Sequence, residues 1–221
     1  MPRILALALV VVGGTLVITL PVSAQQQRVQ FSFAVGGLST KLNTDESAAM
    51  EHLSGLSTGL STTATYRRIG LNVRYLEGSL ESSGGATSRD IVEGEAMFSV
   101  RALRWLHFSF GRHIRSFIRS DGTQRWLFWE ARVRTKARLG TPRLVSSLEL
   151  SHVLSGNVNA AEPFDGGKGM EAELRWTIFP RRSLWMGFGY RIDRSHLGGG
   201  SRTEVVEHIQ VTLGYGHERT N

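Results

Sequence analysis

Apolar and polar side chains alternate along most of this chain. From Val29 onward, successive segments carry apolar residues at every second position, with small or polar residues between them. A period of two residues is the pattern of a β-strand whose two faces meet different surroundings. The apolar positions begin at Val29, Phe31, Phe33 and Val35 and recur within 60–66, 71–75, 92–100, 106–110, 127–133, 144–150, 170–178, 184–192 and 209–215. The pattern predicts an all-β fold of about ten strands, with about eight as the alternative count.

The sixth of these segments indicates what the two faces contact. Its apolar positions, 127, 129, 131 and 133, alternate with the charged stripe Glu130, Arg132, Arg134, Lys136 and Arg138. Such a stripe cannot face lipid, because an ionised side chain at the bilayer centre costs roughly 2.5–3.5 kcal/mol or more. If the apolar face contacts lipid, the charged face lines the inside of a closed barrel, which has no unpaired sheet edges. A soluble barrel or sandwich would show the same alternation with its faces exchanged.

The connections between the predicted strands fall into two classes. Short turns are predicted near 68–70, 102–104, 140–142 and 179–181, whereas longer polar segments lie around 41–58, 78–89, 116–124, 155–167 and 194–203. Short periplasmic turns, long external loops and an even strand count are typical of single-chain barrels of the bacterial outer membrane. The sequence therefore predicts a closed antiparallel transmembrane β-barrel with both termini in the periplasm.

The N-terminal residues have the layout of an export signal. A basic start at Met1-Pro2-Arg3 precedes an uncharged apolar run from Ile4 to Leu20, and the small residues of Val22-Ser23-Ala24 follow it. This layout predicts a secretory signal peptide, residues 1–24, that is cleaved after Ala24 and leaves residues 25–221 as the barrel domain. A retained membrane helix is the alternative, since the apolar run is almost long enough to span a bilayer. Export with a barrel domain predicts localisation in the bacterial outer membrane.

Residues 28–216 resemble a small bacterial outer-membrane barrel, and the strand count is similar to that of the omptin proteases and other ten-stranded barrels. Aromatic residues at strand ends suit two interfacial girdles, with Tyr66, Trp176 and Tyr215 at one and Trp129 and Tyr190 at the other. Residues 209–215 resemble the aromatic-ended last strand that the barrel assembly machinery reads. The chain departs from that pattern by continuing to Asn221. The likeness is one of pattern and includes no residue fingerprint.

Charged residues on the inner faces predict an ion-pair network in the lumen. If each short turn sets the register of its hairpin, Glu93 lies opposite His113, Arg132 opposite Glu149, and Glu171 opposite Arg191. The predicted network comprises Glu93, Glu95, His113, Glu130, Arg132, Arg134, Glu149, Glu171, Glu173, Arg175 and Arg191. A barrel only slightly wider than about eight strands has an interior that such side chains nearly fill.

Composition narrows the classes of partner. The net charge is +7, and the basic residues are almost all arginine, which pairs bidentately with carboxylates and phosphates. No nucleic-acid-binding signature is present, and the absence of cysteine excludes thiol catalysis, cysteine-bound metal and lipoprotein acylation. The predicted partners are outer-membrane lipids, including lipopolysaccharide, and other envelope proteins. A predicted glycolipid-binding patch on an external hairpin consists of Arg112, Arg115, Arg119 and Arg125.

Two groups of residues suggest catalysis, and neither is complete. His107-Phe108-Ser109 resembles the His-x-Ser of outer-membrane lipid A deacylases, but it is predicted to lie in the lumen near the periplasmic end. Asp193 and His196 are similar to the water-activating pair of omptins, but no matching aspartate pair is evident. No metal or cofactor site is predicted. The sequence thus favours a non-enzymatic scaffold or surface-interaction protein; a narrow channel for small anions is the alternative, and a hydrolase at the rim is less favoured.

Overall fold

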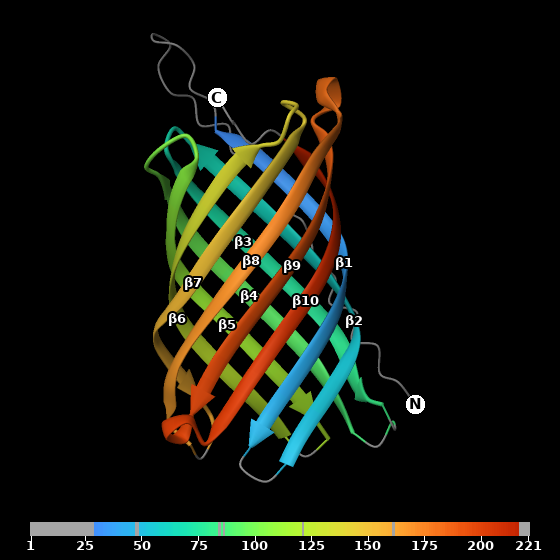
Figure 1. The fold of residues 1–221 in the computed structure, drawn as a ribbon, viewed down its shortest axis with the longest axis vertical. Coiled ribbons are helices and arrows are strands. Elements are labelled where there is room, and N and C mark those ends of the chain that lie inside the picture. Colours follow the sequence, from blue (N-terminus) through green and yellow to red (C-terminus); the bar gives the residue numbers. More distant parts are fainter. Residues whose placement is uncertain are drawn as a thin grey trace.

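The computed structural model describes residues 29–46, 49–83, 85, 87–120, 122–160 and 162–216, which form one closed antiparallel barrel (Figure 1). The predicted signal peptide, residues 1–24, lies outside the described residues. No helix in the described part of the chain is long and apolar enough to cross a membrane.

Ten strands build the wall, as the alternation predicts. They are β1 Gln30–Glu46, β2 Ala49–Tyr66, β3 Ile69–Ser82, β4 Ser88–Arg101, β5 Leu106–Arg119, β6 Gly122–Arg138, β7 Leu144–Val158, β8 Phe164–Phe179, β9 Leu184–Leu197 and β10 Arg202–Gly216. Two 3-10 turns, η1 Pro180–Arg182 and η2 Gly198–Gly200, precede and follow β9.

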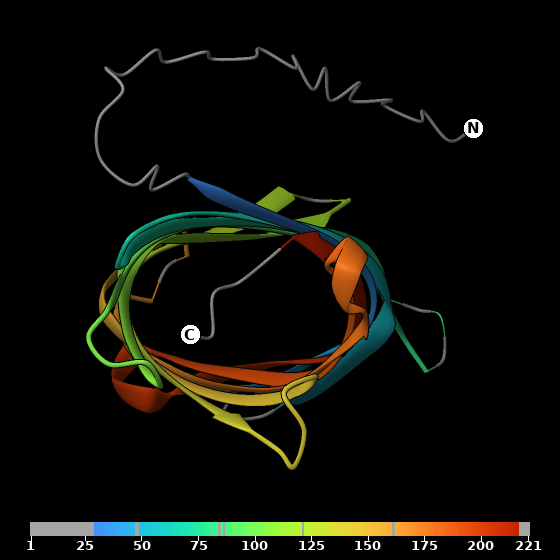
Figure 2. The same cartoon turned by 90° about the horizontal axis from the view of Figure 1, so that it is seen from above.

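Every strand pairs with its neighbours in sequence, and β1 closes the sheet by pairing with β10. This seam runs without interruption from Ser32 opposite Gly216 to Glu46 opposite Arg202. Seen from above, the strands form a complete ring (Figure 2). Closure pairs the backbone groups that an open sheet would leave at its edges. The predicted fold, a closed ten-stranded antiparallel barrel, is confirmed.

The predicted difference in length between the two sets of connections is wrong. One end of the barrel is where β1 starts and β10 ends, and we call it the end near the termini; its connections are 67–68, 102–105, 139–143 and 180–183. The connections at the opposite, distal end are 47–48, 83–87, 120–121, 159–163 and 198–201. Most of the predicted loop 41–58 is paired strand, with Lys41 opposite Ser54 and Asp45 opposite Met50. These segments look like loops in the sequence because their outward side chains are polar, although the backbone ladder continues through them.

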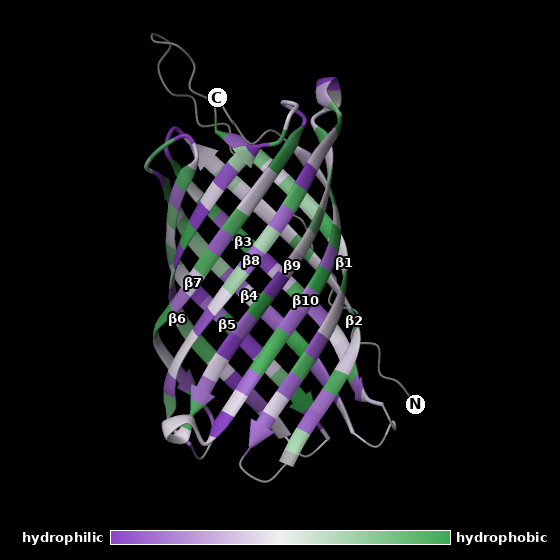
Figure 3. Cartoon of the chain, viewed as in Figure 1, coloured by the Kyte–Doolittle hydropathy of each residue, from purple (hydrophilic) through white to green (hydrophobic). Residues whose placement is uncertain are grey.

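The two halves of the wall have opposite polarity. In the half near the termini, outward positions are apolar, and exposed examples are Phe33, Leu71, Phe110 and Leu213. In the distal half, most outward positions are polar, as at Lys41, Glu81 and Asp90, although Met50, Leu56 and Ile118 are also exposed there. Buried apolar side chains fill the inside of this half. Hydrophobic and hydrophilic residues alternate along the strands over the whole height of the barrel (Figure 3). The hydrophobic face therefore changes from the outside of the barrel to the inside part of the way along the strands.

Candidate functional site

The interior of the barrel is divided into three layers, which follow one another along each strand. On β6, starting from the distal end, Trp126 and Phe128 are followed by Glu130 and Arg132, and then by Arg134 and Lys136. The first pair is apolar and buried, the second pair is charged and buried, and the third pair lines a cavity. The order is the same on β4, where Ile91 precedes Glu93 and Glu95, and Ser99 lines the cavity.

The distal layer is an apolar core, which we call the apolar plug. Trp126 is 1% exposed and Phe117 is 0% exposed, and the rings of Trp126 and Phe128 lie 5.7 Å apart. The apolar plug consists of Leu38, Leu42, Leu53, Leu76, Leu80, Ile91, Phe117, Trp126, Phe128, Leu197 and Val206, with Val153, Val158 and Phe164 packed against it. On its distal side, Arg202 pairs with Glu204 at 2.5 Å, and Gln124 donates to the same carboxylate. Dense packing of this kind leaves little room for water.

The middle layer is a set of buried and partly buried ion pairs, which we call the charge layer. Its members are Arg74, Glu93, Glu95, His113, Arg115, Glu130, Arg132, Arg134, Glu149, Glu171, Arg191 and Asp193. Arg132 is central, because its guanidinium lies 2.9 Å from Glu95, 2.6 Å from Glu130 and 3.4 Å from Glu149. Buried charges remain stable only when they are paired and hydrogen-bonded.

Several of these pairs join strands that are far apart in the sheet. Arg74 on β3 donates two hydrogen bonds, of 3.0 and 3.2 Å, to Glu171 on β8. Arg191 on β9 pairs with Glu95 on β4, and Arg115 on β5 reaches Asp193 on β9 at 2.9 Å. These contacts cross the lumen rather than follow the wall. The charge layer therefore ties opposite sides of the barrel together and occupies the lumen at its level.

The layer nearest the termini is a cavity of about 1000 Å³, which we call the vestibule. It extends from the charge layer, at Arg132 and Glu149, to the turn between β2 and β3. Trp185 forms part of its wall, and the guanidinium of Arg175 lies 4.0 Å from the centre of that ring. Its charged lining is mostly basic: Arg67, Arg68, Arg74, Arg101, Arg132, Arg134, Lys136 and Arg175 against Glu149, Glu171 and Glu173. The electrostatic potential of this cavity favours anions.

The predicted register is correct for one of the three pairs. Glu171 faces Arg191 across β8 and β9. Glu93 faces Arg115 instead of His113, and Glu149 faces Arg134 instead of Arg132. Both errors are of two residues, because each turn is centred one residue further along the chain than the sequence indicates. Arg132 still contacts Glu149, since its long side chain reaches a diagonal neighbour.

The structure places the other predicted network residues, Glu173 and Arg175, in the wall of the vestibule. They pair with each other at 3.1 Å on the same strand, away from the charge layer. The prediction did not include Arg74, Arg115 and Asp193, which belong to the charge layer. The alternation in the sequence shows that these three side chains point inward. Which strands meet across the lumen, however, depends on how the barrel closes.

The predicted glycolipid patch is only partly on the outside. Arg115 is buried in the lumen, so its assignment to the patch is wrong. Arg112 faces outward and lies over the ring of Trp129, 4.7 Å from its centre. Arg119 and Arg125 are exposed near the distal end of the hairpin formed by β5 and β6. Contact of Arg112, Arg119 and Arg125 with glycolipid stays a prediction.

The two candidate catalytic groups differ in their placement. Asp193 points into the lumen, where Arg115 and Arg191 bind it, whereas His196 lies on the other face of β9 and contacts Thr203 at 3.1 Å. The wall separates them, so they cannot act on one water molecule. His107 and Ser109 share a face and line the vestibule at the end near the termini, as the alternation predicts.

The apolar plug is a feature that the sequence pattern did not predict. In the run Trp126-Leu127-Phe128-Trp129, the inward and the outward residues are all apolar, so the alternation between the two faces of the strand is hidden. The signal that could have revealed the plug is the coincidence of inward apolar residues with outward polar ones in the same half of several strands.

Comparison with known proteins gives likeness of architecture only. No protein-family model and no curated protein matches the chain. The solved structure of Neisserial surface protein A has 12% identity and a TM-score of 0.39, with 83% of this chain and 96% of that chain covered. The outer-membrane protease OmpT from Escherichia coli has 7% identity and a TM-score of 0.49, with 89% of this chain and 99% of that chain covered. Ail of Yersinia pestis, solved with a heparin analogue, has 10% identity and a TM-score of 0.35, with 86% of this chain and 99% of that chain covered. Such similarity says nothing about activity.

Proposed function

We propose that this chain is an integral, non-enzymatic protein of the bacterial outer membrane, a barrel with a closed lumen that serves as a membrane scaffold or surface-interaction protein. The observation that carries the proposal is the reversal of polarity along the wall. An apolar outer face requires lipid or another apolar partner, whereas a polar outer face around an apolar core is the arrangement of a protein in water. One half of the barrel suits a bilayer and the other half suits solvent.

The height of the apolar band supports this placement. On β9 the outward apolar positions run from Leu184 to Ile192. That span is eight residue steps of about 3.3 Å on a strand tilted by about 40°, or roughly 20 Å, close to the apolar band of about 25 Å in outer-membrane barrels. Tyr66, Trp176 and Tyr215 are exposed at the end near the termini, and Trp129 and Tyr190 lie toward the other boundary. Aromatic residues favour both interfaces.

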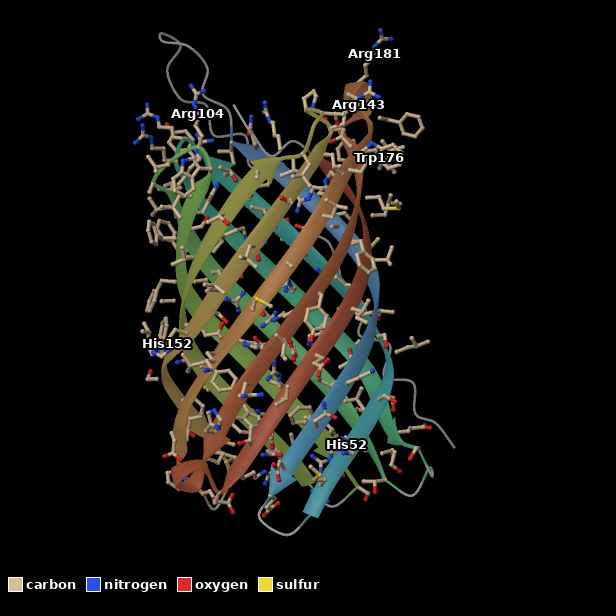
Figure 4. All side chains as sticks on the ribbon, viewed as in Figure 1. His52, Arg104, Arg143, His152, Trp176 and Arg181 are labelled. Atoms are coloured by element: carbon tan, nitrogen blue, oxygen red, sulfur yellow. The ribbon has the colours of Figure 1, made fainter. Side chains whose placement is uncertain are left out.

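The rim near the termini is basic. Arg104, Arg143 and Arg181 project from separate connections at this end, where Trp176 also lies (Figure 4). Arg67 extends over the ring of Tyr66, 5.3 Å from its centre. Guanidinium groups beside interfacial aromatic residues suit the phosphates of lipid headgroups. Because outer-membrane barrels keep their termini in the periplasm, this rim would contact the inner leaflet, and the distal half would project from the cell surface.

A surface-interaction role is supported by this projection. The distal half is made rigid by the apolar plug and presents polar side chains, such as His52 and His152, on its outer wall (Figure 4). Arg119 and Arg125 lie on the same half and are available to phosphates of outer-leaflet glycolipid or to an acidic partner in the envelope.

A narrow anion channel is the second candidate, because the basic vestibule would attract anions. The apolar plug opposes it, since a hydrophobic constriction excludes water and ions. We expect the wild-type protein to give no conductance steps in planar bilayers. The double change Trp126→Ala with Phe128→Ala removes two buried rings from the plug and should allow intermittent conductance. Trp129→Ala, on the outer face of the same strand, is the matched control and should stay closed. Conductance steps from the wild-type protein, as large as those of the double variant, would favour the channel.

The orientation is tested on intact cells. We expect a protease site inserted beside Gly199, at the distal end, to be cleaved from outside, and the same site appended at Asn221 to be protected until the outer membrane is permeabilised. Gly199 lies in η2, and Asn221 follows β10 in the sequence, so neither insertion interrupts one of the ten described strands. Cleavage at the C-terminus of intact cells, with protection at Gly199, would reverse the proposed orientation.

A further inference from the structure

Two buried histidines in the lumen have a ring nitrogen with no hydrogen-bond partner among the described residues. His113 is 1% exposed and His208 is 2% exposed, and the nitrogen concerned is the Nε2 atom of each. Both nitrogens face the same carboxylate: His113 Nε2 lies 3.5 Å from Glu93 Oε2, and His208 Nε2 lies 3.6 Å from Glu93 Oε1. Buried polar atoms are nearly always satisfied, and an exception calls for an explanation such as a bound ion.

We propose that Glu93, Glu95 and His113 bind a divalent first-row transition-metal ion, with Zn²⁺ as the best fit. One ligand atom from each of these three residues lies within 4.8 Å of the other two. His113 Nε2 is 3.5 Å from Glu93 and 3.9 Å from Glu95, which is long for hydrogen bonds. Ligands about 2.0–2.2 Å from a tetrahedral Zn²⁺ stand roughly 3.3–3.6 Å apart. The two distances from His113 Nε2 are within a few tenths of an ångström of this spacing, and the three ligand atoms, which lie within 4.8 Å of one another, would draw closer around a bound ion.

The other ring nitrogen of His113 is held in the manner of a metal ligand. Its Nδ1 atom lies 2.7 Å from Glu130 Oε1 and can donate a hydrogen bond to that carboxylate. A neutral imidazole that donates from Nδ1 directs the lone pair of Nε2 toward Glu93 and Glu95. Carboxylate–histidine–metal arrangements of this kind orient the ring and raise its basicity. The Nδ1 atom of His208 is likewise held, 3.0 Å from the Thr40 hydroxyl.

An ion at this site would compete with an arginine at Glu95, whose Oε1 binds Arg191 and whose Oε2 binds Arg132, but it would find an oxygen of Glu93 that faces His113. Arg115 binds Glu93 through Oε1, while His113 faces Oε2 of the same carboxylate. Among the described residues of the charge layer, the six carboxylates of Glu93, Glu95, Glu130, Glu149, Glu171 and Asp193 outnumber the five guanidinium groups of Arg74, Arg115, Arg132, Arg134 and Arg191. A buried excess of negative charge is unfavourable, and a metal ion or a proton on His113 would remove it.

The donor set favours Zn²⁺ among the available ions. One imidazole nitrogen and two carboxylate oxygens form a borderline set, suited to Zn²⁺ and also to Mn²⁺ or Fe²⁺, and they leave a coordination position for water. His208 stands on the other side of Glu93 and is the nearest candidate for a further ligand. Arg132 links Glu95 to the vestibule, so an ion would enter from that cavity.

The test measures metal bound to the full mature protein. Protein extracted from membranes in detergent is stripped with EDTA, dialysed against Zn²⁺, Mn²⁺ or Co²⁺, and analysed for metal content, with calorimetric titration for affinity. We expect about one Zn²⁺ per chain and, for Co²⁺, visible absorption bands of a site with fewer than six ligands. His113→Gln and Glu93→Gln should abolish stoichiometric binding. Glu130→Gln, which changes the partner of Nδ1 and also removes an ion pair of Arg132, should weaken it roughly 10–100-fold.

His152→Gln is the matched control, because His152 is exposed on the outer wall. This variant should bind as wild type does. If a lumen variant fails to fold, the Co²⁺ spectrum of the wild-type protein still decides the question. Wild-type protein that retains no Zn²⁺, Mn²⁺ or Co²⁺ beyond the background of a metal-free blank would overturn the proposal and leave His113 as a protonated member of the ion-pair layer. So would binding that His152→Gln and His113→Gln reduce equally.

Discussion

Replacing Arg132 with methionine should destabilise the folded barrel by about 3–5 kcal/mol, because it removes one member of a buried ionic group and leaves the others uncompensated. Arg132 is 5% exposed and binds Glu95, Glu130 and Glu149 at once. Methionine fills part of the volume, so the loss comes mainly from the three carboxylates that share its charge. Equilibrium unfolding by urea or guanidinium in lipid vesicles measures the change.

The control for this substitution is Arg138→Met on the same strand. Arg138 is exposed at the rim near the termini, where loss of an ion pair typically changes stability by less than about 1 kcal/mol. A double-mutant cycle on Arg134 and Glu149, which lie 2.7 Å apart, would show coupling between the two sites. If Arg132→Met and Arg138→Met destabilised the barrel equally, the charge layer would contribute nothing to its stability.

The fold could be predicted from alternation because lipid imposes it on every strand. Phe31 is 67% exposed, Phe98 is 50% exposed and Val211 is 52% exposed, each on the outer face that its position in the period of two requires. The charged inner face follows from the same parity. A backbone that must satisfy its own hydrogen bonds in lipid then leaves only a closed barrel. These inferences need no knowledge of which strands meet across the lumen.

The lumen contacts could not be predicted in the same way. Arg74 and Glu171 lie on β3 and β8, and their contact depends on the closure of the barrel and on the tilt of its strands. The register across β4 and β5 depends on where one turn is centred, and an error of one residue there moves every opposite pair by two. The convergence of His113 and His208 on Glu93 joins β5, β10 and β4, which no local pattern brings together.

The apolar plug was hidden because the sequence carries two signals that cancel. In the distal half, the inner face becomes apolar at the level where the outer face becomes polar. Apolar and polar residues therefore still alternate along the strand, but the apolar residues now point into the barrel. Leu42 is buried between outward Lys41 and Asn43, and the sequence alone presents this as a polar loop. Alternation in the sequence indicates that the two faces of a strand differ, but it does not indicate which face contacts lipid at a given height of the barrel.

Val133→Arg tests which half of the barrel lies in the membrane, and it should destabilise the inserted state by about 2–4 kcal/mol near the bilayer midplane. Val133 is 39% exposed on the outer face of β6, between Phe108 on β5 and Leu150 on β7. All three side chains belong to the apolar band. A guanidinium at this point must reach an interface or draw water into the lipid. Folding yield and unfolding free energy in vesicles measure the loss.

The matched substitution is Ser54→Arg, which also adds an outward arginine to an exposed position. Ser54 lies in the distal half of β2, between Lys41 on β1 and Glu81 on β3, where the proposed placement has the wall in water. Its expected effect is within about 0.5 kcal/mol, as for most surface substitutions. Since both changes add the same side chain to the outer face of a strand, strand propensity and inner packing cannot account for a difference between them. Equal penalties at positions 133 and 54 would mean that lipid covers both halves of the wall, and the projecting distal half would have to be abandoned.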